Sequence, residues 1–421
     1  MLDLRELRRD PDSARQALAR RDAAGDFDLA LELDGRRREL IPELEALRAE
    51  QNEANDAIAA ARRDGGDADA QVAAMKEVSE KAKAIQDELA GVEAELQAVV
   101  DKLPNLPEAG APDEDTVIRE AGERPAIESP RDHLELAGDR VDMERGARLS
   151  GSRFAYLRGE LVLLELALVR WVLDLLGEHG FEPVIPPVLV REEALYGTGF
   201  LPDTEQQIYR LADDDLFLVG TSEVALASLH AGEILDAAEL PLRYAGFSPC
   251  FRREAGAAGK DTKGIFRVHQ FDKVEMFSFV APDEAGTEHE RLLAIEEQIM
   301  ERLGLPYRVV DVAIGDLGPS AARKFDCEAW LPSEDRYREL TSTSNTTDFQ
   351  ARRLGIRMRP EGGKPQVLAT LNGTAVAVGR TIIALLENGQ QPDGSVVLPE
   401  CLVAYGAPEL NISTLSNWWT R

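Results

Sequence analysis

Hydrophobic residues recur at every third or fourth position in two long segments of the chain, residues 29–62 and 70–103. A pattern sustained for more than four heptads is typical of a coiled coil. The polar, glycine-containing sequence RDGGDAD (63–69) separates the segments and allows the chain to reverse. We therefore predict two antiparallel helices, each about 45–50 Å long. The hydrophobic positions are Leu33, Leu40, Leu44, Leu47, Ala54, Ile58 and Ala61 in the first segment and Val72, Met75, Ala82, Ile85, Leu89, Val92, Leu96, Val99 and Leu103 in the second.

Two interpretations of this helical arm stay open. It could be a coiled coil that joins two copies of the chain, or a lever that contacts a distant partner. The sequences GRRREL (35–40) and ARRD (61–64) place arginines on it. These arginines fit an anionic partner, and they also fit ordinary solvated positions. We expect Pro42 either to kink the first helix or to mark a boundary.

The pattern changes after the sequence LPNLPEAGAPDEDT (103–116), which is rich in proline, glycine and acidic residues. We interpret this segment as a linker, within residues 103–120, between a helical domain of residues 1–104 and a second domain of residues 105–421. In the second domain, residues 155–180 read as a helix and FEPVIPPVLV (181–190) as a strand whose prolines suit an edge or an interface. Short apolar strands then alternate with helices up to a last helix near 376–388. This order predicts an α+β domain built on an antiparallel sheet.

The chain is acidic, with 48 basic and 77 acidic residues and a net charge of -29. That balance argues against indiscriminate nucleic-acid binding but allows a local basic patch. The three cysteines are too few and too far apart for a disulfide framework or a zinc site. The apolar window 161–177 is interrupted by three charged residues, and the first sixteen residues contain no apolar run. We therefore expect no membrane span, no signal peptide and a cytoplasmic location.

Basic residues gather in FRREAGAAGKDTKGIFRVHQFDKVEMF, residues 251–277. If residues 264–279 form a strand, Phe266, Val268, Val274 and Met276 share a core face, and Arg267, His269, Phe271, Lys273 and Glu275 share the other. On that second face an arginine can pair with phosphate, a phenyl ring can stack on a base and a carboxylate can bind an ammonium group. Phe271 and Glu275 are four positions apart, which is about 13 Å along a strand and about the distance from base to amino acid in an aminoacyl adenylate. The alternative is a polar face exposed to solvent.

Other segments supply further polar groups, whereas the usual nucleotide and hydrolase motifs are missing. EAGAAGKD (254–261) is not a P-loop, and the sequence contains no G-x-G-x-x-G, H-E-x-x-H or G-x-S-x-G motif. Thr221 and Glu223 would share one face if extended. Glu339 and Ser342 offer the hard oxygen ligands that Mg²⁺ prefers. The segment 369–388 runs from a strand through Asn372-Gly373-Thr374 into a helix that carries Arg380. Each of these could instead be an ordinary turn, strand or cap.

These segments together resemble a known family. The segments 181–190, 251–277 and 369–388 look like motifs 1, 2 and 3 of class II aminoacyl-tRNA synthetases. GTSEVALAS, FRREAGAAGKDTKGIFRVHQFDKVEMF, TSTSNTTDFQARR and TLNGTAVAVGRTIIALLEN are similar to segments of seryl-tRNA synthetases. The N-terminal helical pair is similar to that family's tRNA-binding arm. The resemblance covers nearly the whole chain in the family's order, and implies a class II catalytic domain over residues 105–421.

The resemblance implies roles for individual residues. Arg252 would hold the α-phosphate and the serine carboxylate, Glu254 the adenine amino group, and Arg267 the β- and γ-phosphates. Phe271 and Arg380 would enclose adenine, and Glu275 would bind the serine ammonium. The implied catalytic residues are Arg252, Glu275 and Arg380, and the implied Mg²⁺ ligands are Glu339 and Ser342. The implied serine-binding residues are Thr221, Glu223, Arg252, Glu275, Asn372 and Thr374. The implied ATP-binding residues are Arg252, Arg253, Glu254, Arg267, Val268, Phe271, Glu339, Leu340, Thr341, Ser342 and Arg380.

The resemblance also implies an activity and partners. The enzyme would activate L-serine with ATP and transfer it to the 3′ end of tRNA(Ser), with tRNA(Sec) as a further expected substrate, and it would be a homodimer. Two alternatives are a class II-like ligase that loads a carrier protein and a catalytically inactive synthetase-like scaffold. The helical arm argues against the first, because such ligases lack it. The second alternative is opposed by five residues that an inactive site would be expected to lose in part: Arg252, Glu254, Glu275, Glu339 and Arg380.

Overall fold

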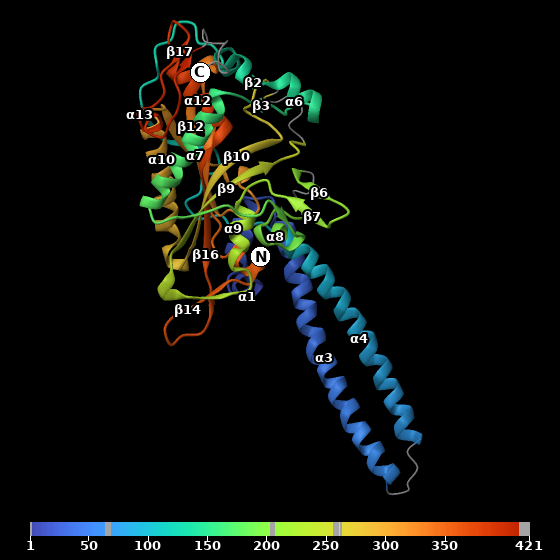
Figure 1. Cartoon of the computed structure of the whole chain (residues 1–421). Coiled ribbons are helices and arrows are strands. Elements are labelled where there is room, and N and C mark those ends of the chain that lie inside the picture. The colour runs from blue at the N-terminus through green and yellow to red at the C-terminus, as the bar shows by residue number, and fades with distance from the viewer. Residues whose placement is uncertain (1, 64–68, 203–206, 256–260, 262, 412–421) are drawn as a thin grey trace. The chain divides into compact units, whose positions relative to one another are not determined.

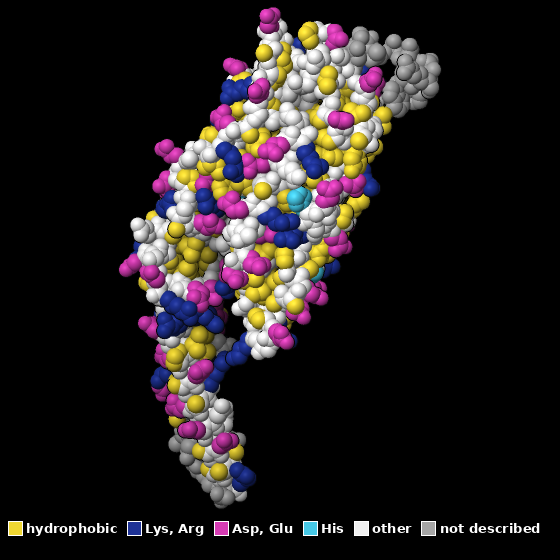
Figure 2. All heavy atoms as spheres, turned by 90° about the vertical axis from the view of Figure 1, so that its left-hand side faces the viewer, with side chains coloured by type: hydrophobic (Ala, Val, Ile, Leu, Met, Phe, Trp, Pro, Cys, Tyr) yellow, Lys and Arg dark blue, Asp and Glu magenta, His cyan; other side chains and the backbone are white. Residues whose placement is uncertain are grey.

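The computed structural model describes residues 2–63, 69–202, 207–255, 261 and 263–411. The chain divides into two compact units, Met1–Pro104 and Asn105–Arg421. Among the described residues, no helix is both long enough and apolar enough to cross a membrane. On the face drawn in Figure 2, acidic side chains are spread among basic and hydrophobic ones. The net charge of -29 is therefore not gathered into one acidic patch on that face.

The first unit contains the predicted pair of long antiparallel helices (Figure 1). Arg36 bonds to Glu88 at 2.8 Å and Gln51 to Ser79 at 3.1 Å across the pair. The first long helix continues through Pro42, so the prediction of a boundary there was wrong; Pro42 is exposed, which removes it from the packing of the two helices. The helices of this unit are α1 (Leu4–Leu7), α2 (Pro11–Ala19), α3 (Ala24–Arg63) and α4 (Asp69–Lys102).

Part of the charge on the arm is used within it. Asp34 of α3 is buried and pairs with Arg8 and with Arg37. Arg36 pairs with Glu88 and with Glu39. Two of the three arginines of GRRREL therefore stabilise the arm itself.

The second unit is built on one eight-stranded sheet. Its neighbours pair antiparallel, except that β4 runs parallel to β9 at one edge. Pro183 lies in this edge strand, as predicted for the segment 181–190, because an edge position tolerates a residue without an N–H donor. In spatial order the strands are β1 (Thr116–Ala121), β11 (Tyr307–Asp311), β12 (Arg323–Leu331), β13 (Arg336–Asn345), β16 (Ala369–Ala377), β10 (Gln270–Val280), β9 (Leu242–Phe251) and β4 (Glu182–Val184).

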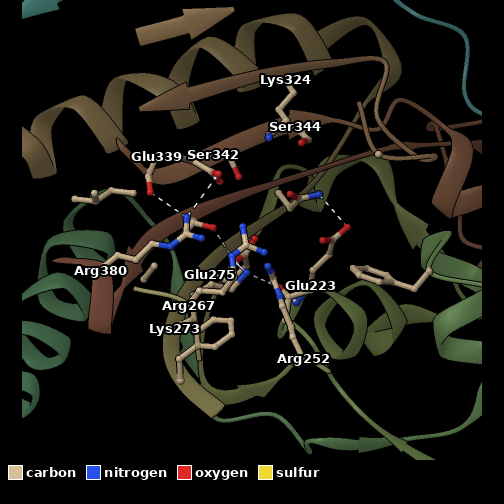
Figure 3. Close-up of a pocket in the computed structure, with 18 of the residues that line it drawn as sticks. Glu223, Arg252, Arg267, Lys273, Glu275, Lys324, Glu339, Ser342, Ser344 and Arg380 are labelled. Carbon is tan, nitrogen blue, oxygen red and sulfur yellow. Dashed lines mark hydrogen bonds and ion pairs between the residues drawn. The ribbon is translucent and has the colours of Figure 1, made fainter. Parts of the chain in front are cut away.

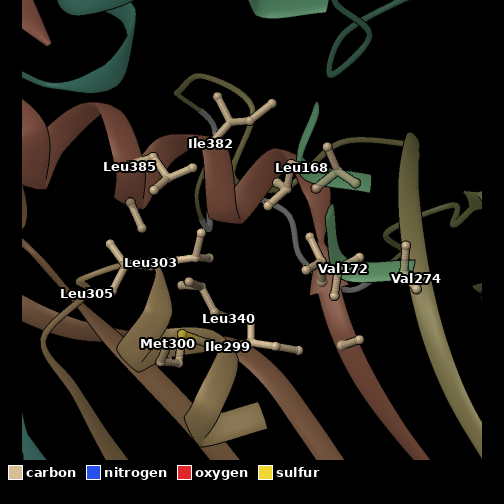
Figure 4. Packing of buried hydrophobic residues seen from close by; sticks show 14 of the residues in the cluster. Leu168, Val172, Val274, Ile299, Met300, Leu303, Leu305, Leu340, Ile382 and Leu385 are labelled. Carbon is tan, nitrogen blue, oxygen red and sulfur yellow. The ribbon is translucent and has the colours of Figure 1, made fainter. Parts of the chain in front are cut away.

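Three helices cover what we call the back face of this sheet, the face that carries Val274 and Met276. Residues of α7 (Glu160–Glu178), α10 (Ala285–Arg302) and α12 (Val378–Gly389) form one hydrophobic cluster with these two side chains. Leu168, Ile299 and Ile382 come together there from the three helices (Figure 4). The opposite, front face carries Glu275 and the cavity described below.

Shorter elements surround the sheet. On the front face, α9 (Glu223–Ala227) and α11 (Phe349–Leu354) pack on Phe277 and Phe279 of β10. The remaining helices are α5 (His133–Ala137), α6 (Met143–Ser150), α8 (Glu192–Thr198) and α13 (Glu400–Val403). The remaining strands are β2 (Val141–Asp142), β3 (Tyr156–Leu157), β5 (Leu189–Val190), β6 (Tyr209–Leu211), β7 (Leu216–Leu218), β8 (Ile234–Asp236), β14 (Arg357–Arg359), β15 (Gln366–Val367), β17 (Ser395–Val396) and β18 (Leu410–Asn411).

Several local predictions were wrong. The strand expected over 264–279 begins only at Gln270. The condition that Glu223 is extended is not met, because it begins α9. Asn372-Gly373-Thr374 continues β16, so the alternative of an ordinary turn does not apply. The helix near 376–388 is followed by another, α13. In each case pairing with distant strands or burial decides the local structure, and a short segment does not reveal these contacts.

The expected linker is bound to the second unit. The backbone N–H of Asn105 donates to the carbonyl of Pro319 at 2.7 Å, and that of Glu108 donates to the carbonyl of Ala322 at 2.9 Å. The side chain of Asn105 is buried and donates to the carbonyl of Ser320. Strand β1 follows and pairs with β11. The chain from Asn105 onward is therefore fixed to the second unit despite its linker-like composition.

Candidate functional site

One cavity of about 370 Å³ opens on the front face of the sheet. Its walls come from β10, β13, β16, β12, the start of α9 and the start of α12 (Figure 3). Among the sixteen residues that the sequence assigns to the site, the following fourteen line it: Thr221, Glu223, Arg252, Glu254, Arg267, Val268, Phe271, Glu275, Glu339, Leu340, Ser342, Asn372, Thr374 and Arg380.

Two of the sixteen lie elsewhere. The backbone N–H of Arg253 donates to the carbonyl of Gln207, and its side chain is exposed. The hydroxyl of Thr341 donates to Glu296 of α10 at 3.0 Å, on the back face of the sheet. Neither side chain lines the cavity.

Irregular strand pairing brings several predicted site residues to one face. Cys327 pairs with Thr341 and Glu328 with Glu339, so Leu340 is an extra residue in β13. Glu339 and Ser342, three residues apart, both line the cavity as a result. In the same way Ala375 is extra in β16, where Val376 pairs with Val274 and Thr374 with Glu275.

Buried acids and amides form one end of the cavity. Glu223 accepts hydrogen bonds from Gln350 at 2.8 Å and from Asn372 at 3.0 Å. Burial raises the pKa of Glu223 to about 7, and the nearby Glu275 carboxylate adds to that effect. Gln350, Lys273 and Arg252 partly oppose it. Glu223 can therefore exchange a proton near neutral pH.

Lys273 connects the acids of this end. Its ammonium group is buried, contacts Glu275 and donates to the hydroxyl of Thr221 at 2.7 Å. Glu275 in turn accepts from Thr374 at 3.4 Å. Glu275 is itself buried, so Lys273 supplies the positive charge that this carboxylate needs.

Arginines and aromatic rings form the other end. The Arg252 guanidinium lies 5.3 Å from the ring of Phe271, and Arg267 pairs with Glu254 at 2.7 Å. Arg380 donates to the carbonyl of Glu339 at 2.9 Å and lies 4.6 Å from the ring of Phe266. Three guanidinium groups that converge on one cavity are suited to a polyanion.

Glu339 and Ser342 fit a hard divalent cation. Burial alone would raise the pKa of Glu339, but the positive charges of Arg380, Lys324 and Arg252 outweigh burial and lower it. The side chain is therefore an anion next to the Ser342 hydroxyl, and Mg²⁺ takes such oxygen ligands together with phosphate oxygens. The part of the chain that the structure describes holds no cluster of three His, Cys, Asp or Glu side chains for a metal ion.

Several cavity residues were missed as site residues. Lys273 stands on the polar face predicted for the strand, a signal that could have found it. Phe266 lines the cavity, although its position in a predicted strand placed it in the core. Lys324, Ser344 and the segments Thr198–Phe200 and Gly318–Ala321 also line it. Ser344 lies within the quoted segment TSTSNTTDFQARR, whereas the others come from distant parts of the chain that carry no recognised motif.

Comparison with known proteins gives the family. Residues 207–389 match the family model described as tRNA synthetase class II core domain (G, H, P, S and T), and residues 1–107 match the model described as Seryl-tRNA synthetase N-terminal domain. The chain is 54% identical over 415 residues to a serine--tRNA ligase of Acidothermus cellulolyticus, covering 96% of this chain and 98% of the relative. It is 51% identical over 421 residues to a serine--tRNA ligase of Mycolicibacterium vanbaalenii, covering 97% and 99%.

Solved structures agree with these matches. The seryl-tRNA synthetase of Pyrococcus horikoshii complexed with ATP superposes with a TM-score of 0.92 and 40% identity, over 98% of this chain and 99% of that one. The cytoplasmic serine-tRNA ligase of Naegleria fowleri in complex with AMP gives a TM-score of 0.84 and 30% identity, over 96% of each chain. The chain belongs to the seryl-tRNA synthetase family of class II aminoacyl-tRNA synthetases.

Proposed function

We infer that this chain is a serine--tRNA ligase, which forms seryl-adenylate from L-serine and ATP and transfers the seryl group to tRNA(Ser). The observation that carries this conclusion is the cavity, which joins an end with three arginines to an end with buried acids and amides. Relatives of nearly equal length are serine--tRNA ligases, and two similar structures hold ATP or AMP. Neither alternative, a carrier-protein ligase or an inactive scaffold, is favoured by any observation here.

We propose that the arginine end binds ATP. Arg252 contacts the α-phosphate and the serine carboxylate, and Arg267 contacts the β- and γ-phosphates after leaving Glu254. Glu254 then accepts from the adenine amino group, and adenine stacks on Phe271. Arg380 encloses adenine from the other side, and the backbones of Val268 and Leu340 lie along the nucleotide. Arg253 and Thr341 stay predictions as ATP-binding residues, because their side chains do not line the cavity.

The first step of the reaction needs no covalent bond to the enzyme. A carboxylate oxygen of serine attacks the α-phosphorus, the bond from that phosphorus to the bridging oxygen breaks, and pyrophosphate leaves. Arg252 and Arg380 stabilise the negative charge that develops, and the cavity holds the reactants in line. Mg²⁺ held by Glu339 and Ser342 would offset the charge of the triphosphate.

We propose that the acidic end selects serine. Glu275 binds the ammonium group, and Thr221, Glu223, Asn372 and Thr374 surround the hydroxyl. A buried site that hydrogen-bonds a substrate hydroxyl strongly rejects an analogue without it, because its own polar groups would then stay unpaired. Alanine would therefore be a poor substrate.

In the second step the 3′-hydroxyl oxygen of tRNA bonds to the seryl carbonyl carbon. The bond from that carbon to the AMP phosphate oxygen breaks, and the departing phosphate accepts the hydroxyl proton. We propose that α3 and α4 bind the tRNA body during this step. The side chain of Arg38 makes no ion pair or hydrogen bond among the described residues, so it is available to phosphate. Charging of tRNA(Sec) stays a prediction.

A shortened arm tests this assignment. Arg36 and Glu88 are hydrogen-bonded neighbours across the two helices, so residues 37–87, which include Arg38, can be replaced by a short glycine-rich turn. Serine-dependent ATP–pyrophosphate exchange should stay unchanged, whereas kcat/KM for tRNA(Ser) should fall about 100-fold, equivalent to about 2.7 kcal/mol of lost contacts. Unchanged charging by the shortened enzyme would refute the role of the arm, and charging of no tRNA by the intact chain would refute the function.

We also propose that the enzyme is a homodimer. Among its exposed hydrophobic side chains, Leu163 and Leu166 lie on α7, and Ile185 and Leu189 lie in the segment 181–190. Exposed apolar residues from neighbouring segments mark an interface, and motif 1 of the family lies in this region. Light scattering of the purified chain should give twice the mass of 46.2 kDa. A cytoplasmic location stays a prediction.

A further inference from the structure

The segment 263–268 brings Phe266, Arg267 and Val268 into the wall of the cavity at its arginine end. Its described residues form neither a helix nor a strand, and β10 begins only at Gln270. A segment without the hydrogen bonds of a helix or strand is fixed only by its contacts with other parts of the protein. The position of Arg267 in the cavity therefore depends on what holds the residues just before it.

His133, the first residue of α5, holds this segment. Its imidazole ring is buried, and Nε2 accepts a hydrogen bond from the backbone N–H of Ile265 at 3.3 Å. Because a backbone N–H can only donate, Nε2 carries no proton and the ring proton is on Nδ1. Nδ1 lies 3.5 Å from a carboxylate oxygen of Glu387, which suits this tautomer. The ring therefore lies between Glu387 and the backbone of the segment.

Gly264 makes room for the imidazole ring. It has a φ of +71°, and a Cβ at this position would overlap the ring of His133. A larger residue would therefore displace either the ring or the backbone of the segment. The neighbouring Lys263 pairs with Asp132, the N-cap residue of α5. Three consecutive residues, from Lys263 to Ile265, are thus bound to the start of α5.

The end of α12 fixes His133 in turn. Glu387 is buried, and its carboxylate accepts from the backbone N–H of His133 at 3.2 Å and from that of Ser333 at 3.1 Å. Gln390 accepts from the backbone N–H of Arg131 at 2.9 Å and donates to its carbonyl at 3.1 Å. The chain that carries His133 is therefore bound to α12 at two successive points.

The start of the same helix contacts the segment directly. Arg380 donates to the carbonyl of Phe266 at 3.4 Å, and the side chains of Arg380 and Arg267 both lie in the cavity (Figure 3). Arg380 and Glu387 are seven positions apart, about two helical turns, so they share one face of α12. This face holds the segment twice, directly through Arg380 and indirectly from Glu387 through His133.

Resting on the proposed function, we propose that His133 is a positioning residue for the triphosphate of ATP. It acts through the backbone of Gly264 and Ile265 and sets the point at which Arg267 meets the β- and γ-phosphates. His133 and Glu387 do not themselves line the cavity. Seryl-adenylate has lost the β- and γ-phosphates, so the effect of His133 should be confined to steps that involve ATP or pyrophosphate.

The test measures ATP–pyrophosphate exchange and transfer in the full-length enzyme. His133→Phe keeps an aromatic ring but leaves the buried N–H of Ile265 without its acceptor. The KM values for ATP and pyrophosphate should rise about tenfold, because Arg267 is misplaced. The KM for serine, and single-turnover transfer from preformed seryl-adenylate to tRNA, should stay within about threefold. His133→Gln, whose amide oxygen can accept the same hydrogen bond, should bring the KM for ATP back to within about threefold of the unmodified enzyme.

A histidine elsewhere in the unit gives the matched control. His230 bonds to Glu233 at 2.7 Å and to Tyr244 at 2.9 Å, and it does not line the cavity. His230→Phe also removes the hydrogen bonds of a histidine ring, and it should change none of these constants by more than about twofold.

A double-mutant cycle separates the contact with Gly264 from general damage to the segment. Gly264→Ala should raise the KM for ATP about tenfold, because its Cβ would overlap the imidazole ring. In a His133→Ala background the ring is absent, and the same change should raise the KM by less than about threefold.

Three results would overturn the proposal: equal effects of Gly264→Ala in the two backgrounds, a KM for serine that rises as much as that for ATP, or an unchanged KM for ATP in His133→Phe. If the unmodified chain shows no serine-dependent exchange, the proposed function has failed. If the unmodified chain exchanges normally and any of the three results is found, only the positioning role of His133 has failed.

Discussion

Both faces of the central sheet bury carboxylates, but the partners of these carboxylates differ between the faces. On the back face, Glu288 accepts two hydrogen bonds from Arg243, at 2.7 and 2.6 Å, and one from Ser278 at 2.8 Å. On the front face, Glu275 contacts Lys273, and Glu223 accepts hydrogen bonds from the neutral amides of Gln350 and Asn372. Glu288 and Arg243 on the back face satisfy each other within the protein. Glu275 and Glu223 on the front face line a cavity that can admit a ligand.

The protonation of these acids shows the same contrast. Burial alone would raise the pKa of Glu288, but Arg243 and Ser278 outweigh burial and lower it. Glu296, also on the back, accepts from the Thr341 hydroxyl and interacts with the Cys327 side chain; burial raises its pKa well above the usual range, which favours its neutral form. On the front, Glu223 has a pKa of about 7. Acids of the back face are thus fixed as charged or neutral, while the front face keeps an acid whose charge a ligand can change.

The largest difference between the two faces should appear in ATP–pyrophosphate exchange when a buried glutamate on each face is changed to glutamine. Glu275→Gln should lower serine-dependent ATP–pyrophosphate exchange about 10³-fold, because the amide cannot offset the serine ammonium charge and leaves Lys273 buried without its carboxylate. Glu296→Gln, the matched change behind the same sheet, should leave exchange within about threefold, because an amide can still accept from Thr341. Equal losses in the two variants would show that the faces do not differ in function.

The second-largest effect should be a dependence of the unfolding free energy on pH that comes from Glu223 on the front face. The folded-state pKa of Glu223 is raised to about 7, so its stabilising contribution is complete below its unfolded pKa of about 4.3 and is lost as pH rises through 7. Above pH 8, Glu223→Gln should therefore be more stable than the unmodified protein by about 4 kcal/mol. At pH 4 the two should be equally stable.

This stability is measured by urea titration followed through tryptophan fluorescence. Trp171 and Trp330 are buried in the second unit, so their fluorescence reports its unfolding. If the stability difference between the two proteins does not grow between pH 5 and pH 8, the assigned pKa of Glu223 is wrong.

A smaller effect should come from breaking the complete pair of the back face. Arg243→Ala leaves Glu288 buried without its partner and should cost about 2 kcal/mol of unfolding free energy at pH 7, measured in the same titration. Arg148→Ala removes an exposed pair with Glu144 on α6 and is the matched control; it should cost no more than about 0.5 kcal/mol. A loss in Arg243→Ala as small as that of the control would place the back pair among ordinary surface pairs.

The features that the sequence predicts correctly depend on local periodicity or lie in complete sequence motifs. The helical arm follows from a 3.6-residue period, and the structure extends it only from residue 29 back to Ala24. The polar face that contains Phe271, Lys273 and Glu275 follows from strand alternation. Fourteen of the sixteen predicted site residues line one cavity because the motifs that carry them pair as neighbouring strands.

What could not be predicted depends on contacts between distant segments. The extra residues Leu340 and Ala375 rotate parts of β13 and β16, and no local signal marks them. Thr341 was assigned to ATP but turns to Glu296, a residue 45 positions away in sequence. Lys324 and Phe200 reach the cavity only through the sheet order and the contact of Gly199 with Ser320.

The most direct test of the account is amino-acid-dependent ATP–pyrophosphate exchange by the unmodified chain, with serine, alanine and threonine supplied in turn and no tRNA present. Glu275, Glu223 and the three arginines of the front face should support rapid exchange with serine. Alanine should be slower by a factor of about 10⁴, because it leaves the buried hydroxyl-binding groups unpaired. No exchange with serine, or equal exchange with alanine, would contradict the assignment of the front face as the site of serine activation.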